Sequence, residues 1–148
     1  MTAYLSDRAT APIAPSPAHG QAATIQVLYC SVALTAALTT ADTLAFFTLP
    51  ANARVHSATL KCTDIDTNGS PAVTISVGDA GSATRYFSSS VVGQAGTVDI
   101  AIAATGRLFK TTAKTPIVGS VGVSAATGVA GTLELAIHYV VEDLATSP

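Results

Sequence analysis

The chain has 148 residues, of which 49% are hydrophobic and 11% are charged, and its formal net charge is -2. This length allows one domain with its own core, and the charged fraction is less than half of the roughly 25% usual for a soluble domain. The basic residues are scattered singly, which excludes a nucleic-acid-binding patch, and the apolar runs are too short for a membrane helix. We therefore expect neighbouring molecules to cover much of the surface, as in a subunit of an assembly.

Residues 1–24 differ in composition from the rest of the chain. They are rich in Ala and Pro, and three prolines fall within six residues, at Pro12, Pro15 and Pro17. Proline at this density forbids a helix interior and a central strand, so we expect an extended arm of polyproline character. Two interpretations are open. The segment is either a disordered tail or an arm that docks on a neighbouring subunit of the assembly, with Ile13 and the three prolines in contact.

From residue 25 onward, strand patterns alternate with turn signals, and 25–148 is predicted to be a single β-sandwich domain. About eight strands at a spacing of roughly 8–12 residues favour an all-β fold, an antiparallel sandwich or jelly roll. The stretch Ser31–Leu44 is the one place where Ala and Leu favour a short helix, although its Thr39-Thr40-Ala41-Asp42 end is typical of a turn. The expected strands are 25–35, 42–49, 53–65, 71–78, 83–90, 96–103, 115–125 and 131–143.

The alternation of apolar and polar residues predicts which side of each strand is buried. The last strand is the clearest case, with an inward row of Leu133, Leu135, Ile137, Tyr139 and Val141. The opposite row is outward and is expected to include a subunit interface, formed by Thr132, Glu134, His138 and Glu142. The same rule predicts that the following residues are inward: Val98, Ile100, Ile102, Ile117, Val121 and Val123.

The two cysteines, Cys30 and Cys62, each lie in an apolar strand pattern. Two are too few for a disulfide scaffold or a zinc site. We expect two small buried side chains, and a disulfide between neighbouring strands is the alternative.

The segment Asp64-Ile65-Asp66-Thr67-Asn68-Gly69 matches the first half of a calcium-binding loop, with oxygen ligands at alternate positions. The Glu required at the twelfth position is replaced by Ile75, and Asn-Gly is a common hairpin turn. The pattern therefore favours a turn, with a weak calcium site at Asp64, Asp66 and Asn68 as the alternative. No other metal or cofactor site is predicted. No nucleophile elbow, phosphate loop or dinucleotide motif occurs, so we expect no enzymatic activity.

Five segments resemble capsid decoration (cement) proteins of tailed bacteriophages, β-sandwich type. They are Leu49-Pro50-Ala51-Asn52-Ala53-Arg54-Val55, Asp66-Thr67-Asn68-Gly69 with the strand Val73–Gly78 after it, Phe87-Ser88-Ser89-Ser90, Gly96-Thr97-Val98, and the closing strand that begins Ala130-Gly131-Thr132-Leu133. The resemblance implies an extended N-terminal arm, frequent assembly as trimers and a position on the capsid surface where coat subunits meet. It implies no individual site residue.

These observations predict a virion structural protein that binds the outer surface of an assembled capsid and stabilises it. Its expected partners are the major capsid protein and further copies of itself, a homotrimer being favoured. No secretory signal pattern is visible, so we expect synthesis in the host cytoplasm before assembly. The alternatives are a carbohydrate- or receptor-binding module of a phage tail or fibre and, last, a jelly-roll hydrolase.

Overall fold

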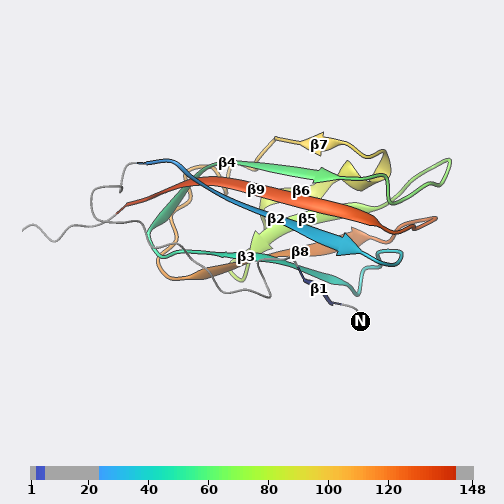
Figure 1. Ribbon diagram of the computed structural model, residues 1–148, viewed down its shortest axis with the longest axis horizontal. Helices are drawn as coiled ribbons and strands as arrows, with labels where there is room; N and C mark the ends of the chain where they lie inside the picture. The colour runs from blue at the N-terminus through green and yellow to red at the C-terminus, as the bar shows by residue number, and fades with distance from the viewer. Residues whose placement is uncertain (1–2, 6–23, 143–148) are drawn as a thin grey trace, which may run out of the picture.

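The structure is a computed structural model that describes residues 3–5 and 24–142. It contains nine strands and one short 3₁₀ helix in the described residues, and Figure 1 shows the strands stacked in two layers. The expected all-β sandwich is confirmed. The elements are β1 (Ala3–Leu5), β2 (Gln26–Leu34), β3 (Thr43–Leu49), β4 (Ala53–Cys62), β5 (Thr74–Asp79), β6 (Ser82–Ser90), η1 (Val92–Gln94), β7 (Val98–Asp99), β8 (Thr115–Val123) and β9 (Gly131–Val141).

The strand order is that of a jelly roll with one added strand. One sheet runs β1-β3-β8-β5-β6 and the other runs β2-β9-β4-β7. Strands β2 to β9 pair antiparallel, while β1 pairs parallel with the edge of β3. Because sequential strands such as β2, β3 and β4 alternate between the two sheets, each connection crosses the end of the sandwich. The turns therefore gather at the two ends, and the two broad faces consist of strands.

The core forms where the inward rows of both sheets meet. On β2 the inward side chains are Leu28, Cys30, Val32 and Leu34, none more than 3% exposed. On β9 the row from Leu133 to Tyr139 is at most 1% exposed, as the alternation predicts, and Val141 is partly buried against the core. At about 25 cal/mol per Å² of apolar surface, this burial is the main source of stability.

The two cysteines belong to this core and are not bridged. Cys30 lies opposite Leu135 on one side of β9, and Cys62 lies opposite Leu133 on the other side. Two strand spacings and an offset of two residues along β9 place the Cα atoms of the cysteines about 12 Å apart, beyond the roughly 7 Å limit for a disulfide. The disulfide alternative is therefore wrong within one chain, and burial raises the pKa of the Cys62 thiol to about 12, since it disfavours the thiolate.

Two sequence expectations about secondary structure are wrong. Residues 31–44 contain no helix, because β2 pairs with β9 along its whole length and tertiary pairing overrides the Ala and Leu propensity. A turn follows, in which Asp42 accepts hydrogen bonds from the backbone N–H and the hydroxyl of Thr39 at 2.8 and 3.1 Å. Residues 39–42 therefore form the turn that their composition favours.

The expected strand at 96–103 shrinks to the two residues of β7. Asp99 accepts hydrogen bonds from the Ser90 hydroxyl at 2.6 Å and from the Ala101 N–H at 2.9 Å, and these bonds turn the chain away from β4. Val98 and Ile100 are consequently 53% and 72% exposed, and only Ile102 is buried as predicted. Val123 is also exposed, because it is the last residue of β8 and lies beyond a register shift against β5.

The Pro-rich arm falls almost entirely outside the described residues. Only Ala3–Leu5 is described, as β1, and it pairs with Thr43 to Ala45 of the same chain. Pro12, Ile13, Pro15 and Pro17 lie outside the described residues. In the part that is described, no helix is long and apolar enough to cross a membrane.

Removing the Leu135 side chain tests the core. Leu135 is fully buried between Cys30 and Leu60 on the flanking strands. We predict that Leu135→Ala lowers the free energy of unfolding by about 2–5 kcal/mol, measured by urea denaturation, because it leaves a cavity. The half-exposed Thr59→Ala on β4 serves as control and should change stability by less than about 1 kcal/mol. Equal effects of the two substitutions would contradict this assignment of the core.

Candidate interaction surfaces

The outer face of the four-stranded sheet carries the predicted contact residues Thr132, Glu134, His138 and Glu142. Strand β9 brings the first three to one side, and Glu142 follows its last residue. All four are half-buried. Because β9 is flanked by β2 and β4 on both sides, its outward row runs along the middle of this face. The structure thus brings the four residues together on one surface, as the alternation predicts.

Both acids on this face are paired within the chain. The Tyr29 hydroxyl donates to Glu134, and the Lys61 ammonium lies 3.0 Å from its other oxygen. Arg54 donates to both oxygens of Glu142, and Lys110 Nζ lies 3.0 Å from Oε2. The hydrogen bonds from Arg54 and Lys110 lower the pKa of Glu142 to about 2, and those from Tyr29 and Lys61 lower the pKa of Glu134. The face is therefore charged but locally neutralised.

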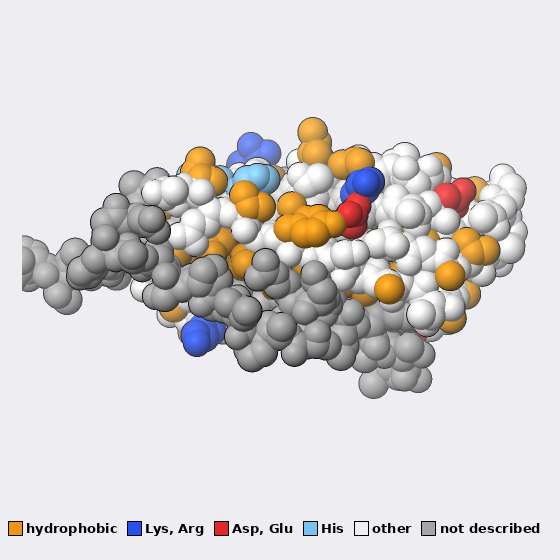
Figure 2. Space-filling view, in the orientation of Figure 1, with side chains coloured by type: hydrophobic (Ala, Val, Ile, Leu, Met, Phe, Trp, Pro, Cys, Tyr) orange, Lys and Arg blue, Asp and Glu red, His pale blue; other side chains and the backbone are white. Residues whose placement is uncertain are grey.

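Exposed apolar side chains lie on the β2 side of this face. Ile25, just before β2, is 59% exposed, and Val27 and Tyr29 on β2 are 52% and 46% exposed. Figure 2 shows hydrophobic side chains next to an adjacent pair of basic and acidic side chains on the visible side of the molecule. The Nδ1 atom of His138 is buried and has no hydrogen-bond partner among the described residues. A mixed surface of this kind is typical of protein–protein contacts, in which apolar anchors lie among polar groups.

The outer face of the other sheet is very different. On its three central strands, β3, β8 and β5, the register forms rows of small uncharged residues: Thr43, Ser120 and Ser76 in one row, and Ala45, Val118 and Gly78 in the next. We call this surface the neutral face. It consists of Thr43, Ala45, Thr48, Thr74, Ser76, Gly78, Pro116, Val118, Ser120 and Gly122.

At one end of this sheet, Asp79 and Arg85 form a nearly buried ion pair. Arg85 Nε donates to Asp79 Oδ2 at 2.5 Å, and Nη2 donates to Oδ1 at 3.1 Å. The guanidinium also stacks on the Phe109 ring, 3.7 Å from its centre. Burial acts to raise the pKa of Asp79, but hydrogen bonds from Arg85 and from two backbone N–H groups lower it below its ordinary value. The two charges cancel and leave the sheet without a net charge.

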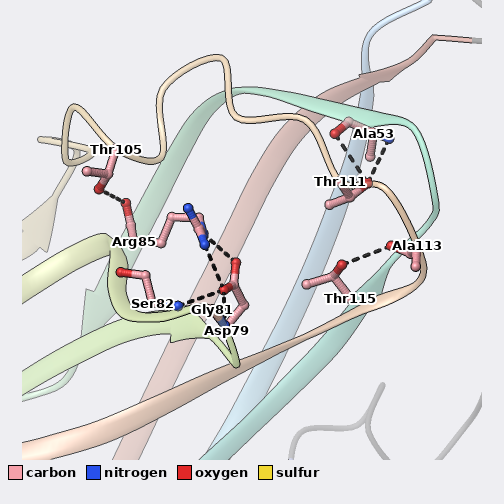
Figure 3. A network of polar contacts seen from close by, with 9 residues as sticks. All are labelled: Ala53, Asp79, Gly81, Ser82, Arg85, Thr105, Thr111, Ala113 and Thr115. Carbon is pink, nitrogen blue, oxygen red and sulfur yellow. Dashed lines mark hydrogen bonds and ion pairs between the residues drawn. The ribbon is translucent and has the colours of Figure 1, made fainter.

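Figure 3 shows this pair at the β5–β6 turn, where the Thr105 hydroxyl also donates to the backbone carbonyl of Arg85 at 3.0 Å. The turn residues Gly81 and Ser82 donate backbone N–H groups to Asp79, at 2.8 and 3.0 Å. The neighbouring surface is a shallow open pocket of about 280 Å³, lined in part by Phe109, Lys114 and Thr115. Nothing in the sequence pattern marked this pair, because its partners are six residues apart across a turn and Phe109 comes from a distant loop.

The segment with the calcium-loop pattern is the turn that the sequence favours, and it is built around Asp66. Its carboxylate accepts four backbone N–H groups, from Ala72, Val73, Ala126 and Thr127, at 2.7–3.1 Å. Burial acts to raise the pKa of Asp66, but these hydrogen bonds hold it far below its ordinary value. N–H groups that surround a carboxylate repel a cation, so Asp66 ties two loops together and does not fit a calcium ligand. Asn68 accepts the Ser70 N–H at 2.9 Å, as in an Asx turn.

The Asp66 cluster leads to a prediction about pH. A folded pKa below the unfolded value gives stability that is present above about pH 4 and is lost as the pH falls. In Asp66→Asn, an NH2 group replaces one carboxylate oxygen and faces backbone N–H donors whose hydrogen bonds it cannot accept. We predict that this substitution lowers the melting temperature at pH 7 by on the order of 5–10 °C.

The pH profile supplies the control for this prediction. The difference in melting temperature between Asp66→Asn and the unmodified protein should shrink below pH 4, since the carboxylate is then progressively protonated in the unfolded chain. Calcium and a chelator should give the same melting temperature. A calcium-dependent rise that Asp66→Asn abolishes would overturn the turn interpretation.

Together, these features define a class of protein. Residues 24–142 form a two-sheet sandwich with a charge-bearing face and a neutral face, and no group of three or more metal-ligating side chains occurs among them. The described polar clusters connect loops of the chain to each other and leave two broad strand surfaces for contact. Such an architecture suits a structural protein that functions through its surfaces.

Comparison with solved structures gives the family. A chain of the Cyanophage Pam1 capsid asymmetric unit is 43% identical, with a TM-score of 0.75, over 89% of this chain and 95% of that one. A chain of the capsid of Ralstonia phage GP4 is 29% identical, with a TM-score of 0.78, over 94% and 97%. No protein-family profile and no curated protein sequence matches. The chain belongs to this family of capsid-associated phage proteins, and its role is structural, in the virion.

Proposed function

We propose that the protein is a decoration, or cement, protein that binds the outer surface of an assembled phage capsid and stabilises it. The observation that carries the proposal is the 43% identity with a chain of a phage capsid asymmetric unit along almost the whole length of both chains. The low charge of the chain supports it, because surfaces with few charges lose little solvation energy when they are buried. The major capsid protein and further copies of this chain are the partners, and a trimer is favoured.

Two parts of the chain are proposed to make the contacts. The first is the Pro-rich arm, with Pro12, Ile13, Pro15 and Pro17, since proline fixes φ and reduces the entropy lost on docking. The second is the outer face of the four-stranded sheet, with Thr132, Glu134, His138 and Glu142. Its half-buried acids already have cationic partners, so a neighbouring protein meets no unpaired charge there. Many weak contacts on one shell then add up through avidity.

A carbohydrate-binding function is less well supported. Sugars are usually held on aromatic faces, and Tyr29 is the one aromatic side chain among residues 24–142 that is more than a third exposed. The remaining Phe and Tyr side chains in that range belong to the core or are half-buried.

Adding the purified protein to capsids that lack it tests the proposal. We expect saturable binding at a fixed ratio to the coat protein, together with a higher temperature of capsid disruption in calorimetry, because a ligand stabilises the state it binds. Capsids assembled from an unrelated coat protein serve as control. If the protein fails to bind mature capsids, or binds without changing their stability, the decoration function is wrong.

Deleting residues 1–20 tests the arm separately. The deletion also removes β1, an edge strand paired only with β3 in the described structure. We expect capsid occupancy to fall by 10-fold or more at equal protein concentration, roughly the effect of losing one of two linked contacts. A triple substitution of Pro12, Pro15 and Pro17 by Ala leaves β1 intact. This variant serves as a matched control for the folding of the sandwich. A folded deletion variant that binds like the full chain would contradict the docking arm.

A further inference from the structure

The loop between β4 and β5 contains a chemically labile pair of residues, Asn68 and Gly69. Both are exposed. Asparagine is among the thermolabile residues, because the next backbone nitrogen can attack its side-chain amide. Glycine in the second position leaves that nitrogen unshielded, since it has no Cβ. The other asparagine of the chain is Asn52, followed by Ala53. The chain therefore contains one exposed Asn-Gly pair and an internal reference for its reactivity.

The backbone nitrogen of Gly69 is available as a nucleophile. It donates no hydrogen bond to any described residue, and apart from the neighbours in the chain no atom lies within 4 Å of the position that a Cβ would occupy. The backbone nitrogen of Ala53 differs in both respects. It donates to the Thr111 hydroxyl at 2.9 Å, and Ala53 is 0% exposed. Attack on the preceding asparagine is thus open at Gly69 and blocked at Ala53.

Two hydrogen bonds hold the Asn68 amide, with opposite effects on this reaction. Oδ1 accepts the Ser70 N–H at 2.9 Å, a donor that stabilises the negative charge developing on this oxygen when Cγ is attacked. Nδ2 donates to the Thr127 hydroxyl at 3.0 Å, across to the loop before β9. Because Nδ2 has to leave this bond in order to depart, the Thr127 hydroxyl restrains the amide.

We propose that Asn68 is a site of spontaneous deamidation and that the Thr127 hydroxyl slows the reaction. The Gly69 nitrogen forms a bond to Cγ of Asn68, and the bond from Cγ to Nδ2 breaks. Nδ2 leaves as ammonia with the proton from the Gly69 nitrogen. One water molecule then opens the succinimide ring to aspartate or isoaspartate. Water is the only co-reactant, and no electrons are transferred.

The products change this end of the sandwich. Both add one negative charge to a loop that already contains Asp64 and Asp66. Isoaspartate also lengthens the main chain by one carbon ahead of Ala72, whose N–H donates to Asp66 at 2.7 Å. The modification therefore strains the cluster that ties the two loops together. It does not depend on binding to a capsid.

Peptide mass spectrometry of the purified full chain, incubated at mildly alkaline pH, tests the site. We expect Asn68 to deamidate at least about 10-fold faster than Asn52, since only its neighbour presents a free nitrogen. Gly69→Ala should slow the reaction at Asn68 by about 10-fold, because the added Cβ shields the nitrogen. The open space around Gly69 means that this variant should fold normally.

Thr127→Val tests the restraint. This variant retains the backbone N–H that Thr127 donates to Asp66 and the carbonyl that accepts the Thr67 N–H. Loss of the one hydrogen bond to Asn68 should accelerate deamidation there by about 2- to 10-fold. Thr67→Val is the matched control, because the Thr67 hydroxyl also contacts Thr127, at its carbonyl, but does not touch the Asn68 amide. It should leave the rate unchanged.

Three results would overturn the proposal: equal rates at Asn68 and Asn52, an unchanged rate in Gly69→Ala, or the same rate in Thr127→Val as in Thr67→Val. All are measured on the isolated protein. Failure of the deamidation site is thus separable from failure of capsid binding, which is measured by adding protein to shells.

Discussion

The pairing of β9 with both β2 and β4 is the interaction on which the rest of the structure depends. One row of this strand, from Leu133 to Tyr139, supplies the centre of the core. The other row places Glu134 within reach of Lys61 on β4 and Tyr29 on β2. A shift of one residue in its register would bury the acid and expose the leucines. The same alternation therefore fixes the core and the position of the charges on this face.

The two faces of the sandwich differ in charge. The four-stranded sheet and the loops at its ends carry most of the charge of the described residues. The five-stranded sheet keeps its one ion pair nearly buried and presents Thr, Ser, Ala and Gly to its surroundings. The shortage of charged side chains is therefore most pronounced on the five-stranded sheet. This distribution of charge is found in a chain that is similar to chains of phage capsids.

Much of the fold is predictable from period-2 alternation, because one buried face per strand leaves a direct trace in the sequence. The inward row of β9 is correct from Leu133 to Tyr139, and Cys30 and Cys62 are buried as expected. The alternation misleads at Val98 and Ile100, where Asp99 uses its carboxylate to end the strand early. It also cannot identify the partners of Asp66, which come from loops far along the chain. Long-range hydrogen bonds of this kind have no periodic signature, so a calcium loop and a structural turn look alike in sequence.

The contact surfaces are predictable only in part. Alternation brings Thr132, Glu134 and His138 to one face, but it does not reveal that Glu134 is paired within the chain. Small outward residues indicate packing against a partner, yet the neutral face becomes visible only when the register aligns β3, β8 and β5. The pair of Asp79 and Arg85 is likewise a product of the β5–β6 turn.

The decoration function can be tested by a cryo-electron-microscopy reconstruction of a particle that carries the protein. We expect density for the sandwich on the outside of the shell, in contact with the coat protein. Density in the tail or inside the shell would contradict the decoration function.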